Sequence, residues 1–205
     1  MKSFLLCTAF LAVTLSAAAQ TSSVTLLTFA GYTFAYKFQT YYGYGKIQDA
    51  FQWGAGLEFG IQPGAAMELI YLRSDPEAYY DESFSSQLSG KIGLNYIMLG
   101  ATRYAPINDV VSGFGTFDMG VGFTSNIAET LYSSNVTKFA IGGRLGLKVA
   151  PNDKVSLRIH AQILSPVQWI GGGVYLGTGG SGASVSTGST IWQFNLGGSL
   201  NYRIK

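Results

Sequence analysis

The chain has 205 residues, of which 47% are hydrophobic, 12% are charged and 27 are glycine. Its 13 basic and 11 acidic side chains nearly cancel, so charge gives no reason to expect nucleic acid as a partner. No apolar run of about 18 residues follows the first twenty residues, which excludes helical membrane spans from the rest of the chain.

Residues 1–19 have the layout of a secretory signal peptide. The basic Lys2 precedes an apolar run over residues 4–15, and three small residues, Ala17 to Ala19, follow. We therefore expect cleavage before Gln20 and export of residues 20–205 as one domain. Because Cys7 is the only cysteine, the exported chain would have neither disulfides nor thiolate metal ligands.

The exported part shows an alternation of period two. In residues 192–204, WQFNLGGSLNYRI, every second position from Trp192 is apolar or glycine, and the positions between are polar or glycine. Similar alternation predicts eight strands, near residues 28–38, 51–61, 65–73, 88–104, 114–124, 137–149, 155–164 and 191–204. The predicted fold class is all-β, an eight-stranded antiparallel up-and-down transmembrane β-barrel.

The predicted connections alternate in length. Those at 62–64, 106–113 and 151–153 are short and rich in turn formers, whereas 39–50, 74–87, 125–136 and 165–190 are longer. Outer-membrane barrels have short periplasmic turns and longer external loops. We therefore expect both chain termini on the periplasmic side of the outer membrane.

The apolar phase of each strand is expected to face lipid, which makes outer-membrane lipids and lipopolysaccharide the expected partners. In the strand at 88–104 we assign Ile92, Leu94, Tyr96 and Met98 to this face. An aromatic girdle is expected at both rims. Its predicted members are Tyr36, Trp53, Tyr71, Phe123, Phe139 and Trp192 at the outer rim, and Tyr104 and Tyr202 at the inner rim.

Charged side chains are expected in the opposite phase, facing the lumen. An eight-stranded barrel is just wide enough to be filled by side chains, and an isolated buried ion is costly. We therefore predict a lumen ion network in which two arginines bridge three carboxylates and block the passage of water. Its predicted members are Glu58, Glu68, Lys91, Asp118, Arg144, Arg158 and the single histidine, His160.

Strand registers sharpen this hypothesis. Pairing Ile61 with Ala65 places Glu58 opposite Glu68, two like charges that need a cation between them. Pairing Thr124 with Lys138 places Asp118 opposite Arg144. Pairing Val149 with Val155 places His160 opposite Arg144 as well. The network is either a structural filling of the barrel or a functional element: a gate, an ion site or a proton-sharing carboxylate pair.

Two of the long connections have unusual compositions. The acidic loop 74–87 holds Asp75, Glu77, Asp81 and Glu82, which indicate either a solvated loop or a calcium site. The Gly/Ser-rich loop 165–190 indicates a mobile exposed loop, or one that docks on another membrane subunit. Five tyrosines, at positions 41, 42, 44, 79 and 80, indicate either an external contact surface or additional girdle residues.

Over residues 24–205 this pattern resembles the small eight-stranded outer-membrane barrels, such as the OmpA transmembrane domain, OmpX and OmpW. The last strand ends Tyr202-Arg203-Ile204-Lys205 without a terminal aromatic, and with Gln20 at the predicted mature start this is similar to Bacteroidota barrels. The resemblance implies the architecture of these barrels. The function that we expect is that of a non-enzymatic structural component, or of an accessory subunit that contacts other outer-membrane proteins. The alternative is a narrow, porin-like pore for ions or small solutes.

A lipid-modifying barrel enzyme is the third possibility. Such an enzyme needs a histidine with serine and acidic partners within reach of lipid, and an acyltransferase also needs an apolar lumen. His160 is predicted to point inward, with Ser156 beyond hydrogen-bond reach. We therefore expect no catalytic residues, no cofactor and no metal.

Overall fold

The computed structural model describes residues 23–40, 43–82, 85–126, 137–166, 171–177, 180–186 and 192–205. The side chains of residues 37–45, 78–89, 126 and 171–186 are not described. The predicted signal peptide lies outside the described residues, so its removal remains a prediction. No helix in the described ranges is long and apolar enough to cross a membrane.

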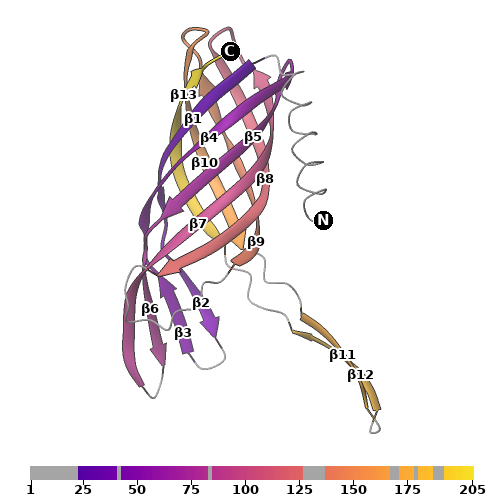
Figure 1. The fold of residues 1–205 in the computed structure, drawn as a ribbon. Helices are drawn as coiled ribbons and strands as arrows, with labels where there is room; N and C mark the ends of the chain where they lie inside the picture. Colours follow the sequence, from indigo (N-terminus) through magenta and orange to yellow (C-terminus); the bar gives the residue numbers. More distant parts are fainter. Residues whose placement is uncertain are drawn as a thin grey trace, which may run out of the picture.

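Thirteen strands account for nearly all of the described chain. They are β1 (Ser23–Thr33), β2 (Tyr36–Thr40), β3 (Gly43–Ile47), β4 (Ala50–Gln62), β5 (Ala65–Ser74), β6 (Glu77–Glu82), β7 (Ser85–Pro106), β8 (Val111–Asn126), β9 (Thr137–Val149), β10 (Val155–Pro166), β11 (Gly171–Gly177), β12 (Gly180–Ser186) and β13 (Gln193–Arg203). Eight of them close into an antiparallel barrel in the order β1-β4-β5-β7-β8-β9-β10-β13, because β1 pairs with β13 and β7 pairs with β8 (Figure 1). The predicted fold class is confirmed.

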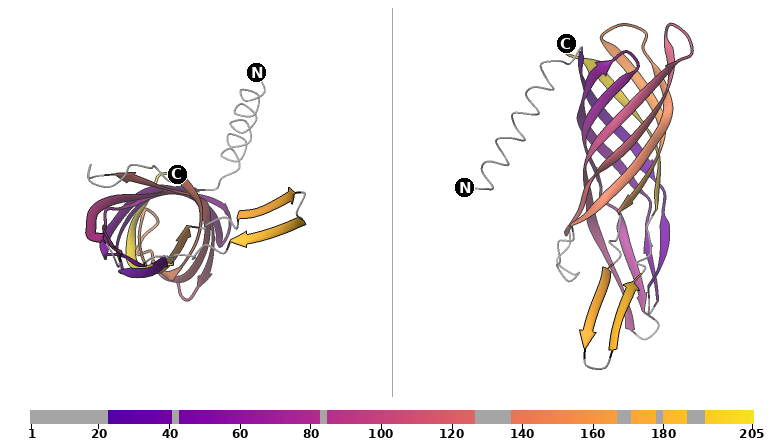
Figure 2. Two further views of the ribbon diagram at one scale, coloured as in Figure 1. Left: turned by 90° about the horizontal axis from the view of Figure 1, so that it is seen from below. Right: turned by 90° about the vertical axis from the view of Figure 1, so that its right-hand side faces the viewer.

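The barrel has two distinct ends. At the turn end, three short connections join β4 to β5, β7 to β8 and β9 to β10, and the C-terminus lies there (Figure 1). The N-terminal side of β1 is tied to the C-terminus there, since the backbone N–H of Val24 donates to the carbonyl of Lys205 over 3.0 Å. The opposite end, called the loop end below, carries the remaining strands (Figure 2).

Segments predicted as long loops contain strands at the loop end. β2, β3 and β6 pair in sequence onto the first half of β7 and extend the sheet beyond the barrel, while β11 and β12 form a separate hairpin (Figure 1). The expectation of loops at 39–50, 74–87 and 165–190 was therefore wrong over these strands. Antiparallel neighbours satisfy the backbone groups there, although the side-chain alternation is weak.

The lipid-facing phase was predicted correctly for seven of the eight barrel strands: β1, β4, β5, β8, β9, β10 and β13. Side chains such as Leu145 (71% exposed) and Leu200 (57%) face outward, and most of the intervening residues are buried or half-buried. The exposed apolar band accordingly encircles a filled interior. This is the arrangement that a barrel in lipid requires.

The phase of β7 was predicted wrongly. Tyr96 and Met98 are 3% and 0% exposed and face the lumen, whereas Ile97 and Leu99 are each 45% exposed and face outward. Both phases of this strand carry apolar residues, so periodicity could not separate the lipid face from an apolar interior. The prediction had assumed that the lumen is polar throughout.

Candidate functional site

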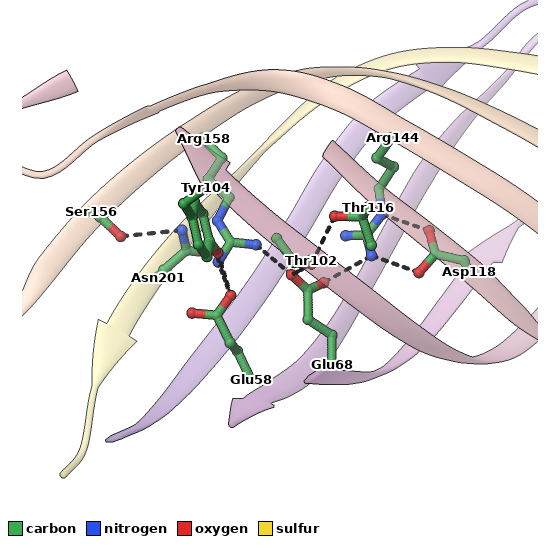
Figure 3. Close-up of polar contacts among 10 residues, drawn as sticks. All are labelled: Glu58, Glu68, Thr102, Tyr104, Thr116, Asp118, Arg144, Ser156, Arg158 and Asn201. Atoms are coloured by element: carbon green, nitrogen blue, oxygen red, sulfur yellow. Dashed lines mark hydrogen bonds and ion pairs between the residues drawn. The ribbon is translucent and has the colours of Figure 1, made fainter. Parts of the chain in front are cut away.

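Five charged residues meet inside the barrel near the turn end and are called the ionic layer here. They are Glu58, Glu68, Asp118, Arg144 and Arg158, and each is at most 5% exposed. They come from β4, β5, β8, β9 and β10, because the alternation of each strand turns these positions inward. Figure 3 shows their side chains converging in the lumen.

Arg144 joins two of the carboxylates. Its Nε and Nη2 donate to the two oxygens of Asp118 at 2.9 and 2.7 Å, and Nη2 also donates to Glu68 Oε2 at 2.8 Å. This forked contact with Asp118 uses the planar guanidinium, which has donors at fixed spacing. Arg144 is therefore held in one orientation across the lumen (Figure 3).

Arg158 lies between the two glutamates that face each other across β4 and β5. Its Nη1 donates to Glu68 Oε1 at 2.8 Å, and its Nη2 donates to Glu58 Oε2. The predicted pairing of Glu58 with Glu68 is confirmed, although a bulge at Ile61 makes Gln62, not Ile61, the partner of Ala65. The cation expected between these like charges is the Arg158 guanidinium.

Hydroxyl groups from β7 and β8 complete the layer. Thr102 donates to Glu68 Oε1 at 2.7 Å and is 2.8 Å from the hydroxyl of Thr116. The Tyr104 hydroxyl donates to Glu58 and also contacts Arg158. Sequence reasoning missed Thr102 and Tyr104, because the wrong phase of β7 put Tyr104 in the inner girdle and Thr102 on the lipid face. It missed Thr116, which lies in the inward phase of β8, because only charged side chains and the histidine were assigned to the network.

The ionic layer ties opposite walls of the barrel together. β5 and β10 lie four strands apart in the ring of eight, and the ion pair between Glu68 and Arg158 joins them directly. The layer itself has three carboxylates and two guanidinium groups. A further cation, Lys148, places its Nζ 4.6 Å from the centre of the Tyr104 ring, next to the layer on the turn side.

An apolar layer lies on the loop side of the ionic layer. Its members are Leu27, Phe29, Ile70, Leu72, Tyr96, Met98, Ala140 and Leu164, all at most 7% exposed. Phe29 joins the two layers, since the Arg144 guanidinium carbon lies 5.3 Å from the centre of its ring. The lumen is therefore apolar in this part, which contradicts the polar lumen predicted from sequence.

Two predicted members of the network form no described hydrogen bond or ion pair with the ionic layer. Lys91 is exposed on β7 and is paired in register with Glu77 of β6, outside the barrel lumen, because the phase of β7 is opposite to the one assumed. His160 is buried in the lumen but stands opposite Gly146, not Arg144. Its ring packs edge-on against Phe29 and Phe114, with centroid distances of 6.1 and 6.4 Å.

The two predicted registers around Arg144 were each wrong by two residues. Arg144 stands opposite Thr116 on β8 and opposite Gln162 on β10. The reason lies in the lengths of the connections. In the connection between β9 and β10, for example, Val149 pairs with Leu157 and not with Val155, so this connection is two residues longer than assumed. A shift of two residues keeps each side chain on its face, which explains why Arg144 still reaches Asp118.

The structure places six of the eight predicted girdle residues on the outer surface. Trp53, Phe139, Trp192 and Tyr202 are exposed, and Tyr71 and Phe123 are partly exposed in the outward phase. Tyr104 and Tyr36 are corrections, since both turn inward. β1 and β2 are interrupted at Phe34 and Ala35, which are both exposed, and this changes the phase so that Tyr36 contacts the buried Gln193.

The predicted loop sites have mixed outcomes. Asp75 of the acidic segment forms an ion pair with Arg73 at 2.9 Å, and the described residues contain no cluster of three metal-binding side chains. The side chains of Asp81, Glu82 and the five tyrosines, and those of residues 167–190, lie outside the described set.

Two cavities flank the layers. At the turn end, a cavity of about 440 Å³ is lined by residues that include Glu58, Tyr104, Lys148 and Arg203. At the loop end, a cavity of about 250 Å³ is lined by residues that include Tyr36, Tyr96, Lys138 and Gln193. The ionic and apolar layers separate the two.

Comparisons with known proteins agree with this architecture. The structure of Neisserial surface protein A superimposes with a TM-score of 0.58 at 14% identity, covering 87% of this chain and 95% of that one. OprG from Pseudomonas aeruginosa gives a TM-score of 0.54 at 12% identity, covering 89% of this chain and 97% of the other. At these identities the likeness concerns the fold alone.

None of the curated proteins compared with this sequence matches it. The family model described as outer membrane protein beta-barrel domain matches residues 5–168, most of the chain. With the closed eight-stranded barrel and its apolar outer band, this match shows that the chain belongs to the outer membrane protein beta-barrel family and is an integral protein of the outer membrane.

Proposed function

We propose that this protein is a closed, non-enzymatic outer-membrane barrel that acts as a structural component or accessory subunit of a larger outer-membrane assembly. The observation that carries the proposal is the double filling of the lumen. A solute would have to displace both the ionic layer and the apolar layer, and the ionic layer joins opposite walls through paired, buried charges.

The proposal gives the loop end the role of contacting partners. β2, β3 and β6 prolong the barrel wall by continuous strand pairing, and the β11–β12 hairpin adds a second projection. We assign the turn end to the periplasm, because outer-membrane barrels keep their short turns there. The chain termini would then be periplasmic, and the strand extension would face outward, with lipopolysaccharide around the barrel.

Electrical recordings test whether the barrel is closed. The purified barrel, inserted in planar bilayers, should show no steady conductance, with protease protection of the barrel in liposomes as the control for insertion. Large, steady open currents would overturn the proposal.

Cross-linking tests the accessory role. A photo-crosslinking residue at Tyr79, in the strand extension, should form a defined adduct with another outer-membrane protein in intact cells. The same residue at Ile107, in the exposed turn between β7 and β8, is the matched control. Absence of an adduct from Tyr79, or the same adduct from both sites, would contradict a partner at the loop end.

The second candidate is a narrow pore for ions or small solutes. It is favoured by the two cavities, which approach the filled region from opposite ends and leave only the two layers to be moved. The same recordings separate it from the first proposal. Intermittent, reproducible openings that vanish when Lys148 or Arg203 is replaced would support the pore.

A lipid-modifying enzyme is the third candidate. An acyl chain would find apolar surroundings in the lumen, contrary to our expectation from sequence, yet no described group is arranged to attack an ester. The ring of His160 is enclosed by Phe29 and Phe114, and its Nδ1 has no hydrogen-bond partner among the described residues. Ser156 instead accepts a hydrogen bond from Asn201 at 3.3 Å.

A further inference from the structure

The cavity at the loop end combines an apolar wall with a few polar groups. Its volume is about 250 Å³. Its apolar lining includes Ile47, Ile92, Leu94 and the ring of Tyr96, and its polar lining includes Tyr36, Lys138 and Gln193. Tyr96 belongs to the apolar layer, which closes the cavity toward the ionic layer. The cavity is therefore a dead end.

A chain of hydrogen bonds runs along one wall and has a fixed direction. Tyr96 donates its hydroxyl proton to Gln193 Oε1 at 3.0 Å, and Gln193 Nε2 donates to the hydroxyl oxygen of Tyr36 at 3.0 Å. Because Tyr36 accepts from the amide, its own proton is available to a further acceptor. No described residue takes that proton, so the chain ends in a donor at the cavity.

A cation lines the same cavity. Lys138, on β9, lines it and has no carboxylate partner among the described residues. An ammonium group has three donors and no acceptor. Beside an apolar wall, the cavity thus presents one positive charge and the hydroxyl donor of Tyr36, and the polar residues Asn95 and Thr124 also line it.

The size of the cavity limits what it can hold. Pockets for drug-sized ligands measure roughly 300–1,000 Å³, and an apolar cavity of about 150 Å³ is enough for benzene. A volume of about 250 Å³ therefore suits a substituted benzene ring or a short alkyl chain.

We infer that this cavity binds a small carboxylate with an apolar body, its two oxygens at Lys138 and Tyr36 and its body against Ile92, Leu94 and Tyr96. A carboxylate matches the one cation of the lining, Lys138, and the hydroxyl donor of Tyr36, whereas an amine would meet a like charge at Lys138. The ligand is held at the loop end and is not passed through the barrel. This inference does not depend on a partner in the membrane.

Binding to the barrel in nanodiscs of zwitterionic lipid tests the inference. Titration with 4-ethylbenzoate should give saturable heat of binding, while 4-ethylbenzylamine, which has the same body and the opposite charge, should give none. Nanodiscs without protein serve as the blank. Equal binding of the two compounds, or no binding of the carboxylate, would overturn the inference.

Variants locate the site. Lys138→Gln should weaken binding of 4-ethylbenzoate about tenfold, which corresponds to about 1.4 kcal/mol. Tyr36→Phe should weaken it about threefold, and Ile92→Phe should abolish it by filling the cavity. Lys154→Gln, at an exposed lysine of the turn end, is the matched control and should leave binding unchanged.

The heat-dependent mobility of each variant on gels reports that its barrel is folded. Folded Lys138→Gln and Ile92→Phe barrels that bind the carboxylate as tightly as the parent would contradict the site. A failure of this kind leaves the conductance result untouched, because the recordings use no ligand.

Discussion

The ionic layer and the apolar layer fill neighbouring parts of one lumen by different means. In the apolar layer, Leu27, Ile70 and Met98 are at most 1% exposed, and they need only compatible shapes. In the ionic layer each charge needs a partner in defined geometry, because a buried ion left alone is costly.

The two layers therefore have different roles in the fold. Apolar contacts are non-directional and would survive a shift of neighbouring strands with repacking. The contacts of Arg158 with Glu58 and Glu68 join β10 to β4 and β5 and would be lost if the strands slipped. The apolar layer therefore supplies burial, and the ionic layer fixes the register of the closed barrel.

Removing one cation from the ionic layer should have the largest effect on stability. Arg144→Met leaves Asp118 and Glu68 buried without their bridge, and we expect it to lower the free energy of unfolding by about 3–5 kcal/mol. Urea unfolding of the barrel in lipid vesicles measures this change. Arg103→Met, on an exposed arginine of β7, is the control, and equal losses for the two variants would refute the assigned role.

Shortening a side chain of the apolar layer should cost somewhat less. Leu72 is 1% exposed in the lumen, and Leu72→Ala should lower the free energy of unfolding by about 2–4 kcal/mol through lost contacts and an unfilled cavity. Leu69→Ala, on the same strand but 49% exposed toward lipid, should cost less, since lipid can fill the space. The reverse order in the same unfolding assay would argue against a packed apolar layer.

The sequence predicted those features that repeat along each strand. Strand number, barrel closure and the outward phase of most strands follow from alternation, which the hydrocarbon outside enforces. Glu58 and Glu68 were brought together correctly because the observed two-residue turn, Pro63 and Gly64, together with the bulge at Ile61 gives the same register as the three-residue turn assumed from sequence. Gly64 has a φ of 76°, which glycine adopts readily.

The sequence could not predict which face of a strand meets lipid where both faces of the strand are apolar. β7 carries Tyr96 and Met98 in one phase and Ile97 and Leu99 in the other, so hydrophobicity alone does not say which pair meets lipid. The strand extension also escaped prediction, because its strands are held by backbone pairing with β7 more than by an apolar pattern. The registers beside Arg144 depended on turn lengths that the sequence left open.

The smallest change that should distinguish the ionic layer from the apolar layer is the addition of a single methyl group at Gly100. This glycine stands opposite both Glu68 and Asp118, on the strand between them. A Cβ there would lie 2.5 Å from Asp118 Oδ1 and 3.3 Å from Arg144 Nη2. Gly100→Ala should therefore push the Asp118 carboxylate off Arg144 and lower the free energy of unfolding by about 1–3 kcal/mol.

Gly143→Ala is the matched control for this substitution, since a Cβ there would meet only the Thr116 carbonyl oxygen at 3.7 Å. It should leave stability nearly unchanged. If the loss at Gly100 acts through the ion pair, it should shrink in an Asp118→Ala background, where no carboxylate opposes the new methyl group. An equal loss in both backgrounds would mean that the methyl group acts through its other close neighbour, Thr116 Cγ2 at 3.1 Å, or through the backbone of β7, and not through the ion pair of Asp118 with Arg144.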